Sequence, residues 1–128
     1  MTGNEETAPY EITYEDRGAY LYAHVDGQFD TVATSLRYWS DVAAECRKRG
    51  HRRMLVVEDF QTEASTSDVF QVAERLPAIT RGLKVAFVDE RFAELSTNKF
   101  GEDVAVNRGA QGRVFADAAS ADEWLRHS

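Results

Sequence analysis

The sequence predicts an α/β domain with a mixed, mostly parallel sheet of about five strands and about four helices. An unbroken apolar run, Met54 to Val57, has the pattern of a strand buried on both faces. A segment near the N-terminus, Tyr10 to Glu15, alternates apolar and polar residues, as a strand with one face in water does. Segments of helical periodicity separate the later strands, which favours right-handed crossovers and parallel pairing.

The bulk composition is that of an ordinary soluble globular protein. A chain of 128 residues, 43% hydrophobic and 29% charged, can form one domain with its own core. A net charge of -7 argues against a nucleic-acid partner, which needs a cationic face. The acidic start has no signal-peptide pattern, and no apolar run approaches the ~20 residues of a membrane span. We therefore expect a cytoplasmic protein without integral membrane association.

The N-terminal half is expected to open with an antiparallel hairpin. Residues 1–8 are predicted to be a disordered tail, and residues 9–128 a single domain. Tyr10 to Glu15 form the outer strand, and Gly18 allows a tight connection because glycine readily takes positive φ. Ala19 to Val25 form the return strand. An exposed outer strand could pair with a second copy of the chain, so a homodimer is one open possibility.

The first helix and the central strand follow the hairpin. Asp30 is predicted to cap a helix over about Thr31 to Arg49, and Gly50 has the place of a left-handed C-cap. The central strand ends in acidic residues and leads into a polar loop, Gln61 to Asp68. In α/β proteins this position, after the carboxyl end of a strand, is where a site usually lies.

The rest of the chain alternates helices and strands. Pro77 is expected to kink the second helix or to end it early, because proline has no backbone donor. The predicted elements are a helix from Ser67 or Asp68 to about Ile79, a strand over Leu83 to Val88, a helical region over 91–108, a strand over Arg113 to Ala116, and a last helix with a capping box at Ser120 to Glu123.

This order of elements resembles the STAS domain, and more narrowly the small stand-alone SpoIIAA-like (STAS/SEC14-like) proteins of bacteria. The resemblance covers about residues 9–126 and is carried by the segments Met54 to Asp59, Leu83 to Asp89 and Arg113 to Leu125. It implies a SpoIIAA-like βα superhelix. It also implies a non-enzymatic regulatory or protein-interaction module. Such a module would bind a protein partner through the loop and the helix start that follow the central strand.

The loop after the central strand contains the candidate site. STAS domains of the anti-sigma-factor-antagonist type carry Asp-Ser-(Ser/Thr)-Gly here, with a phosphorylatable hydroxyl. The present chain keeps hydroxyls at Ser65, Thr66 and Ser67 but lacks the Asp-Ser pair and the glycine. These residues, with Asp59, are candidates for phosphorylation or partner binding; alternatively, one hydroxyl caps the helix and the others are solvated. The SEC14-like side of the resemblance implies instead a carrier of a small apolar ligand or lipid.

The other polar residues of the sequence form no pattern that is typical of an enzyme. Aspartates fall at four predicted strand ends and could bind Mg²⁺ or cap helices: they are Asp26, Asp59, Asp89 and Asp117. His24 has no partner that the sequence can place, and Cys46 is the single cysteine. No nucleophile motif and no Gly-rich phosphate loop is present. We therefore expect no catalytic residues, no metal and no cofactor.

An aromatic-rich set of residues could line an apolar pocket, although ordinary core is the default reading. The set comprises Tyr10, Tyr14, Tyr20, Tyr22, Trp39, Phe60 and Phe70. A basic run from Arg47 to Arg53 could contact an anionic partner, but such a run is also typical of a solvated helix end.

Overall fold

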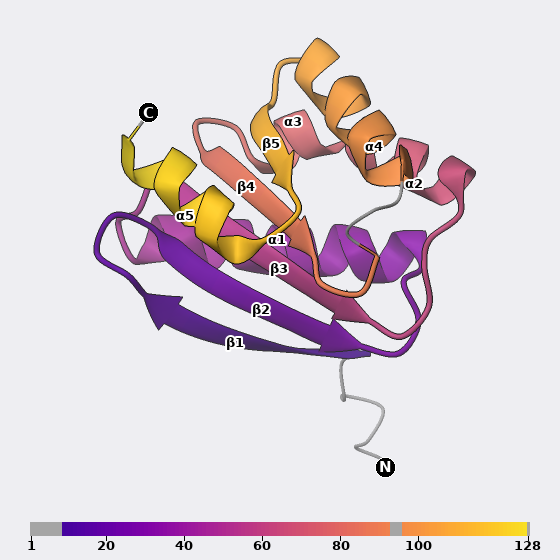
Figure 1. The fold of residues 1–128 in the computed structure, drawn as a ribbon, viewed down its shortest axis with the longest axis horizontal. Helices are drawn as coiled ribbons and strands as arrows, with labels where there is room; N and C mark the ends of the chain where they lie inside the picture. The colour runs from indigo at the N-terminus through magenta and orange to yellow at the C-terminus, as the bar shows by residue number, and fades with distance from the viewer. Residues whose placement is uncertain (1–8, 93–95, 128) are drawn as a thin grey trace.

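The computed structural model describes residues 9–92 and 96–127, which form a five-stranded sheet with helices on both faces (Figure 1). The elements in order are β1 (Tyr10–Asp16), β2 (Leu21–Gly27), α1 (Val32–Lys48), β3 (Arg53–Phe60), α2 (Thr66–Ala73), α3 (Leu76–Ile79), β4 (Lys84–Asp89), α4 (Ser96–Asn107), β5 (Gln111–Phe115) and α5 (Ala118–His127). The predicted disordered tail, residues 1–8, lies outside the described residues.

The sheet has the strand order β1-β2-β3-β4-β5, with β3 at its centre. β1 and β2 pair antiparallel, with Ile12 opposite Val25, and every later pair is parallel. The turn between β1 and β2 contains Gly18 at a φ of 79°. The predicted mixed sheet with its antiparallel N-terminal hairpin is therefore confirmed.

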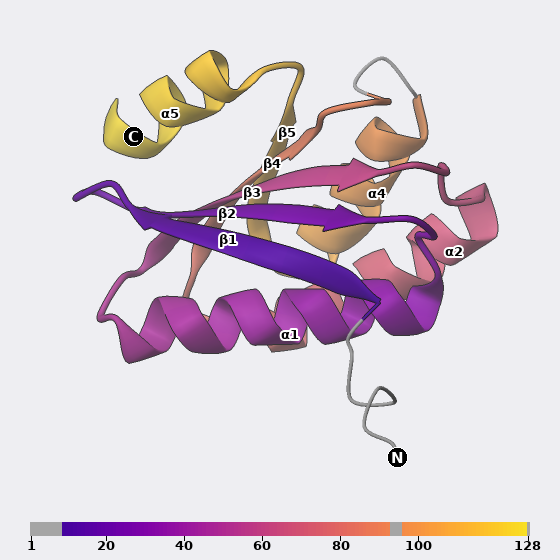
Figure 2. The same cartoon turned by 90° about the horizontal axis from the view of Figure 1, so that it is seen from below.

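Two helical layers enclose the central strand (Figure 2). α1 runs along one face of the sheet and α5 crosses the other. Met54 and Val56 belong to the core under α1, whereas Leu55 and Val57 belong to the core under α5. None of these four side chains is more than 4% exposed. The unbroken apolar run is thus explained by burial on both faces, as the sequence predicted.

α2 and α4 pack against each other beside α1 and β5. Their close approach depends on Gly101 in α4, since a Cβ atom built there would lie 2.8 Å from Cγ1 of Val69 in α2. The predicted second helix is divided into α2 and α3, and Pro77 lies in the first turn of α3, where no backbone donor is required. The predicted early end therefore occurs, but it lies at Glu74 and Arg75, before the proline rather than at it.

Three helix starts differ from the sequence prediction. Thr31, not Asp30, caps α1, and its side chain accepts a hydrogen bond from the Thr34 amide. Asp30 instead turns inward, where its carboxylate accepts a hydrogen bond from the Ser35 hydroxyl. The second helix begins at Thr66, because Ser65 is its N-cap. The last helix begins at Ala118 rather than after Ser120.

The predicted capping box at Ser120 is wrong, because Asp117 occupies the capping position. Its Oδ1 atom accepts a hydrogen bond from the Ser120 amide at 2.7 Å. The helical region predicted over 91–108 corresponds to α4, although residues 93–95 lie outside the described residues.

Among the described residues, no helix combines the length and the apolar character that crossing a bilayer requires.

Candidate functional site

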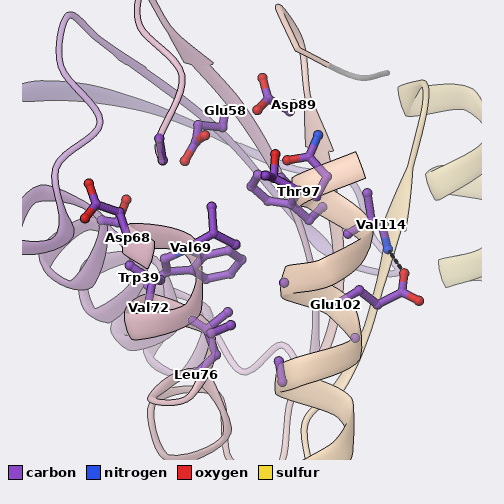
Figure 3. A pocket seen from close by; sticks show the side chains of 18 of the residues that line it. Trp39, Glu58, Asp68, Val69, Val72, Leu76, Asp89, Thr97, Glu102 and Val114 are labelled. Atoms are coloured by element: carbon purple, nitrogen blue, oxygen red, sulfur yellow. Dashed lines mark hydrogen bonds between the residues drawn. The ribbon is translucent and has the colours of Figure 1, made fainter. Parts of the chain in front are cut away.

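An apolar pocket of about 130 Å³ lies between the α1 face of the sheet and helices α1, α2 and α4 (Figure 3). Trp39 from α1, Val69 and Val72 from α2, and Leu76 from α3 contribute to its wall. Val114 from the edge strand β5 lines the opposite side. The pocket is therefore formed by segments that are distant in the sequence.

Small residues account for the space at this position. Ala73, Gly101, Ala105 and Gly112 line the pocket on α2, α4 and β5. Because none of them has a side chain larger than a methyl group, the helices and the edge strand can approach one another without filling the volume between them. The wall is thus built of short side chains on α2, α4 and β5 and of larger apolar side chains on α1, α2 and α3.

Carboxyl groups gather at one end of the pocket. Figure 3 shows Glu58 and Asp89 at this end and Leu76 at the other. Glu58 and Asp89 are directly paired in the register of β3 and β4, so their side chains leave the sheet on the same face. Both are buried, at 6% and 7% exposure. Asp30, just before α1, reaches the same place and is hydrogen-bonded to Glu58.

Hydrogen bonds hold this acidic end in place. The Tyr38 hydroxyl on α1 donates to Oε2 of Glu58. Oδ1 of Asp89 accepts a hydrogen bond from the Phe92 amide at 3.0 Å. Two carboxyl groups in contact cannot both be charged at low cost, and we infer that Glu58 carries a proton and donates it to Asp30.

Burial shifts the titration of all three carboxyl groups upwards. Burial is the main reason why the pKa of Glu58 lies well above its usual value, and the charge of Asp30 raises this pKa further. The hydrogen bond from Tyr38 opposes these effects. Burial likewise raises the pKa of Asp30 and of Asp89. The end of the pocket can therefore both donate and accept hydrogen bonds.

The predicted recognition loop forms the rim of this pocket. Glu63, Ala64 and Asp68 are among the lining residues. Oγ of Ser65 accepts a hydrogen bond from the Asp68 amide at 3.1 Å, so this serine is an N-cap. Ser65, Thr66 and Ser67 are all exposed. The structure thus brings the three predicted hydroxyl residues together beside the pocket.

Asp59 lies elsewhere, because neighbouring residues in a strand point to opposite faces. Its Oδ1 atom accepts a hydrogen bond from Arg91 at 2.7 Å, and its Oδ2 atom lies 3.8 Å from Nε2 of His24. Nε2 of His24 also lies 3.1 Å from Oε1 of Glu90. His24 therefore has two acidic neighbours that the sequence could not place.

His24, Asp59 and Glu90 offer one ligand atom each within 4.8 Å of one another. The guanidinium of Arg91 pairs with Asp59. We therefore interpret these three residues, together with Arg91, as an ion-pair network. The other strand-end aspartates are divided between different roles, since Asp89 faces the pocket and Asp117 caps α5.

Comparison of the sequence with protein-family models finds no match, and comparison with curated proteins finds no match either. The resemblance to the STAS domain therefore stays a prediction. What the structure establishes is the α/β fold with its mixed sheet. The functional argument rests on the pocket and on its acidic end.

Sequence reasoning missed Glu58, Asp30 and Tyr38 as site residues. A signal for Glu58 was present, because it continues the two-residue alternation of Met54 and Val56 onto the α1 face. The same alternation places Asp89 beside it on β4. No comparable signal pointed to Tyr38, whose contact with Glu58 depends on how α1 packs on the sheet.

Proposed function

We propose that this protein is a small-molecule-binding module that holds a ring-sized apolar ligand in the pocket between α1, α2, α4 and the sheet. The observation that supports the proposal is the apolar pocket of about 130 Å³ with a polar group at one end. Small-molecule sites are typically apolar concavities with a few polar groups that orient the ligand. An apolar cavity of ~150 Å³ is enough to bind benzene.

The size of the pocket favours a small apolar ligand over a whole lipid. A pocket on the scale of one aromatic ring can enclose a ring or a short chain but not two acyl chains. The proposal therefore keeps the carrier function that the SEC14-like resemblance implies and narrows its ligand to small molecules.

Trp39 provides a direct test, since it lines the pocket whereas Trp124 packs on the α5 face. The chain has two tryptophans, so Trp124→Phe leaves Trp39 as the single tryptophan, whose fluorescence can be excited selectively. We expect toluene to change the Trp39 fluorescence in a saturable way. We also expect it to raise the melting temperature, because a ligand that binds only the folded state stabilises it.

A matched pair of variants separates pocket binding from surface adsorption. Ala105→Leu places a larger side chain in the pocket and should abolish the saturable signal. Ala119→Leu makes the same change at an exposed position of α5 and should leave the signal unchanged. The proposal is wrong if toluene gives no saturable response up to its solubility limit in a folded protein.

A second candidate function is a non-enzymatic regulatory module that binds a protein partner through the loop Gln61 to Asp68. The exposure of Ser65, Thr66 and Ser67 at the pocket rim favours it. A charge at Ser67 would lie beside the positive end of α2 and would change the surface offered to a partner.

Ser67→Asp and Ser65→Asp should change which proteins from the native host are retained by the purified chain. Ser40→Asp, on the exposed side of α1, is the matched control and should change nothing. Intact-mass analysis of the chain from its host would detect a phosphate directly. Identical retention by all three variants would rule this candidate out.

A further inference from the structure

The pocket is lined by many more acidic groups than basic groups. The acidic lining residues are Asp30, Glu58, Glu63, Asp68, Asp89 and Glu102. Among the described lining residues, Arg113 is the basic one. Its guanidinium lies over the Phe115 ring, 5.2 Å from the ring centre, and Phe115 packs against the core on the α5 face. The positive charge of Arg113 is therefore directed away from the pocket.

The acidic groups at the inner end have no basic counterpart among the residues that the structure describes. Within residues 9–92 and 96–127, no salt bridge joins Asp30, Glu58 or Asp89 to a lysine, arginine or histidine. Glu102 differs from them, because Lys99 lies 2.6 Å from its Oε2 atom. Buried acids without a counter-charge remain costly, and the chain lowers this cost by keeping a proton on Glu58.

We propose that the ligand carries an ammonium group on its apolar body, and that this group lies among the carboxyl groups of Glu58, Asp30 and Asp89. This inference rests on the proposed small-molecule function and names the chemical class of the ligand. The apolar body would contact Trp39 and Val72, and the ammonium N–H groups would donate to the carboxylate oxygens. A charge-assisted hydrogen bond of this kind is stronger than one between neutral groups.

Proton release follows from this arrangement. When the ammonium group binds, the proton that Glu58 holds in the free protein passes to solvent, and the resulting carboxylate pairs with the ligand cation. Apart from Arg113, whose charge is directed away, the other titratable side chains among the described lining residues are Tyr38 on α1, Asp68 on α2, Glu63 in the loop and Glu102 on α4. These four are acidic groups, so none of them supplies a competing positive charge.

The chemistry disfavours the other ligand classes. A carboxylate or phosphate ligand would be repelled by the carboxylates of Asp30 and Asp89, and the described part of the chain offers it no basic partner at the inner end. A neutral hydroxyl could hydrogen-bond there but would leave the buried carboxylates without a counter-charge. The ammonium group is the one that supplies both hydrogen-bond donors and charge.

Three probes of one shape test the inference: benzylamine, benzyl alcohol and toluene. Their affinities are measured by Trp39 fluorescence in the Trp124→Phe protein. At pH 8 we expect benzylamine to bind at least about tenfold more tightly than benzyl alcohol. The preference for benzylamine over benzyl alcohol should shrink as the pH is lowered towards 5, because Glu58 is then protonated in a larger fraction of the molecules and binding must displace that proton. Calorimetry in two buffers of different ionisation enthalpy should show release of a proton.

Glu58→Gln should lower benzylamine affinity about tenfold, should end proton release, and should leave toluene affinity within about threefold. Glu63→Gln removes a carboxyl group at the exposed rim and should change benzylamine affinity less than about threefold. Asp89→Asn provides a second test at the inner end if Glu58→Gln does not fold, and it should also lower benzylamine affinity selectively.

The outcomes distinguish the inference from the proposed function. Toluene binding without a preference for benzylamine over benzyl alcohol overturns the inference and leaves the small-molecule function standing. Benzylamine binding that survives Ala105→Leu shows attraction to the acidic surface and also overturns it. If neither toluene nor benzylamine gives a saturable signal, the proposed function itself is wrong.

Discussion

The hydroxyl of Tyr38 on α1 donates a hydrogen bond to Oε2 of Glu58 on the central strand, and both side chains are buried. The tyrosine ring is held by aromatic neighbours, with its centre 5.5 Å from that of Trp39 and 6.0 Å from that of Phe60. This bond therefore joins the first helix to the middle of the sheet at the acidic end of the pocket.

Tyr38→Phe should lower the free energy of unfolding by about 1–2 kcal/mol, because it leaves the buried Glu58 carboxyl without one hydrogen-bond donor. Urea unfolding at pH 7 measures the change. Tyr20→Phe is the matched control. It removes a hydroxyl that donates to Asp122 at 2.6 Å, but that carboxylate is partly exposed and water can replace the tyrosine. Equal stability of Tyr38→Phe and wild type would show that the buried bond does not contribute.

Glu58→Gln should change how stability depends on pH. Burial raises the folded-state pKa of Glu58 above its unfolded value of about 4.3, so the folded chain binds more protons. Stability contributed by the protonated group is complete below the unfolded pKa and is lost as the pH rises towards the folded pKa. The wild type should therefore lose stability relative to Glu58→Gln as the pH rises from about 4.3.

The measurement is urea unfolding of both proteins at a series of pH values. Asp16 and Asp122 should act in the opposite sense in both proteins, because hydrogen bonds lower the pKa of each carboxyl. Their contribution is present above the unfolded pKa and is lost as the pH falls below it. Parallel stability curves for wild type and Glu58→Gln would contradict a raised pKa at Glu58.

Gly27→Ala should destabilise the fold by about 1–3 kcal/mol through overpacking. A Cβ atom at this position in β2 would lie 2.3 Å from Cε1 of Phe60, a ring that is 1% exposed and cannot move aside freely. Gly112→Ala is the matched control, because the nearest atom to its new Cβ, the carbonyl oxygen of Val85, lies at 3.6 Å. Thermal unfolding should show a lower melting temperature for Gly27→Ala and little change for Gly112→Ala.

Cys46 should be almost inert towards thiol reagents in the folded protein. Its side chain is fully buried on α1, and burial raises the pKa of the thiol to about 11. Because the thiolate is the reactive form, a rise from the ordinary value of 9.0 lowers the thiolate fraction at neutral pH about a hundredfold. Labelling with a disulfide reagent at pH 8 should be slow in buffer and rapid in urea. Rapid labelling without denaturant would show that α1 opens readily.

The succession of strands and helices along the chain could be predicted because it depends on local patterns. Met54 to Val57 are apolar without interruption, whereas Tyr10 to Glu15 alternate between apolar and polar residues. The residue pattern of each strand therefore indicates which of its faces are buried. The helix starts were harder to predict. Asp30 and Thr31 are both suitable N-caps, and Thr31 takes this role because tertiary contacts draw the Asp30 side chain towards Ser35 and Glu58.

By itself, the sequence determined that β3 is buried on both faces and that it carries acidic residues near its end, since residue alternation and apolar runs act within a few positions of the chain. Only the tertiary structure decided that Glu58 faces α1 while Asp59 faces His24 and Arg91, and that a pocket forms beside Glu58. The physical reason is that a pocket is the volume left between packed elements. Its shape depends on how closely α2 and α4 approach, which Gly101 permits although it lies far from Glu58 in the sequence.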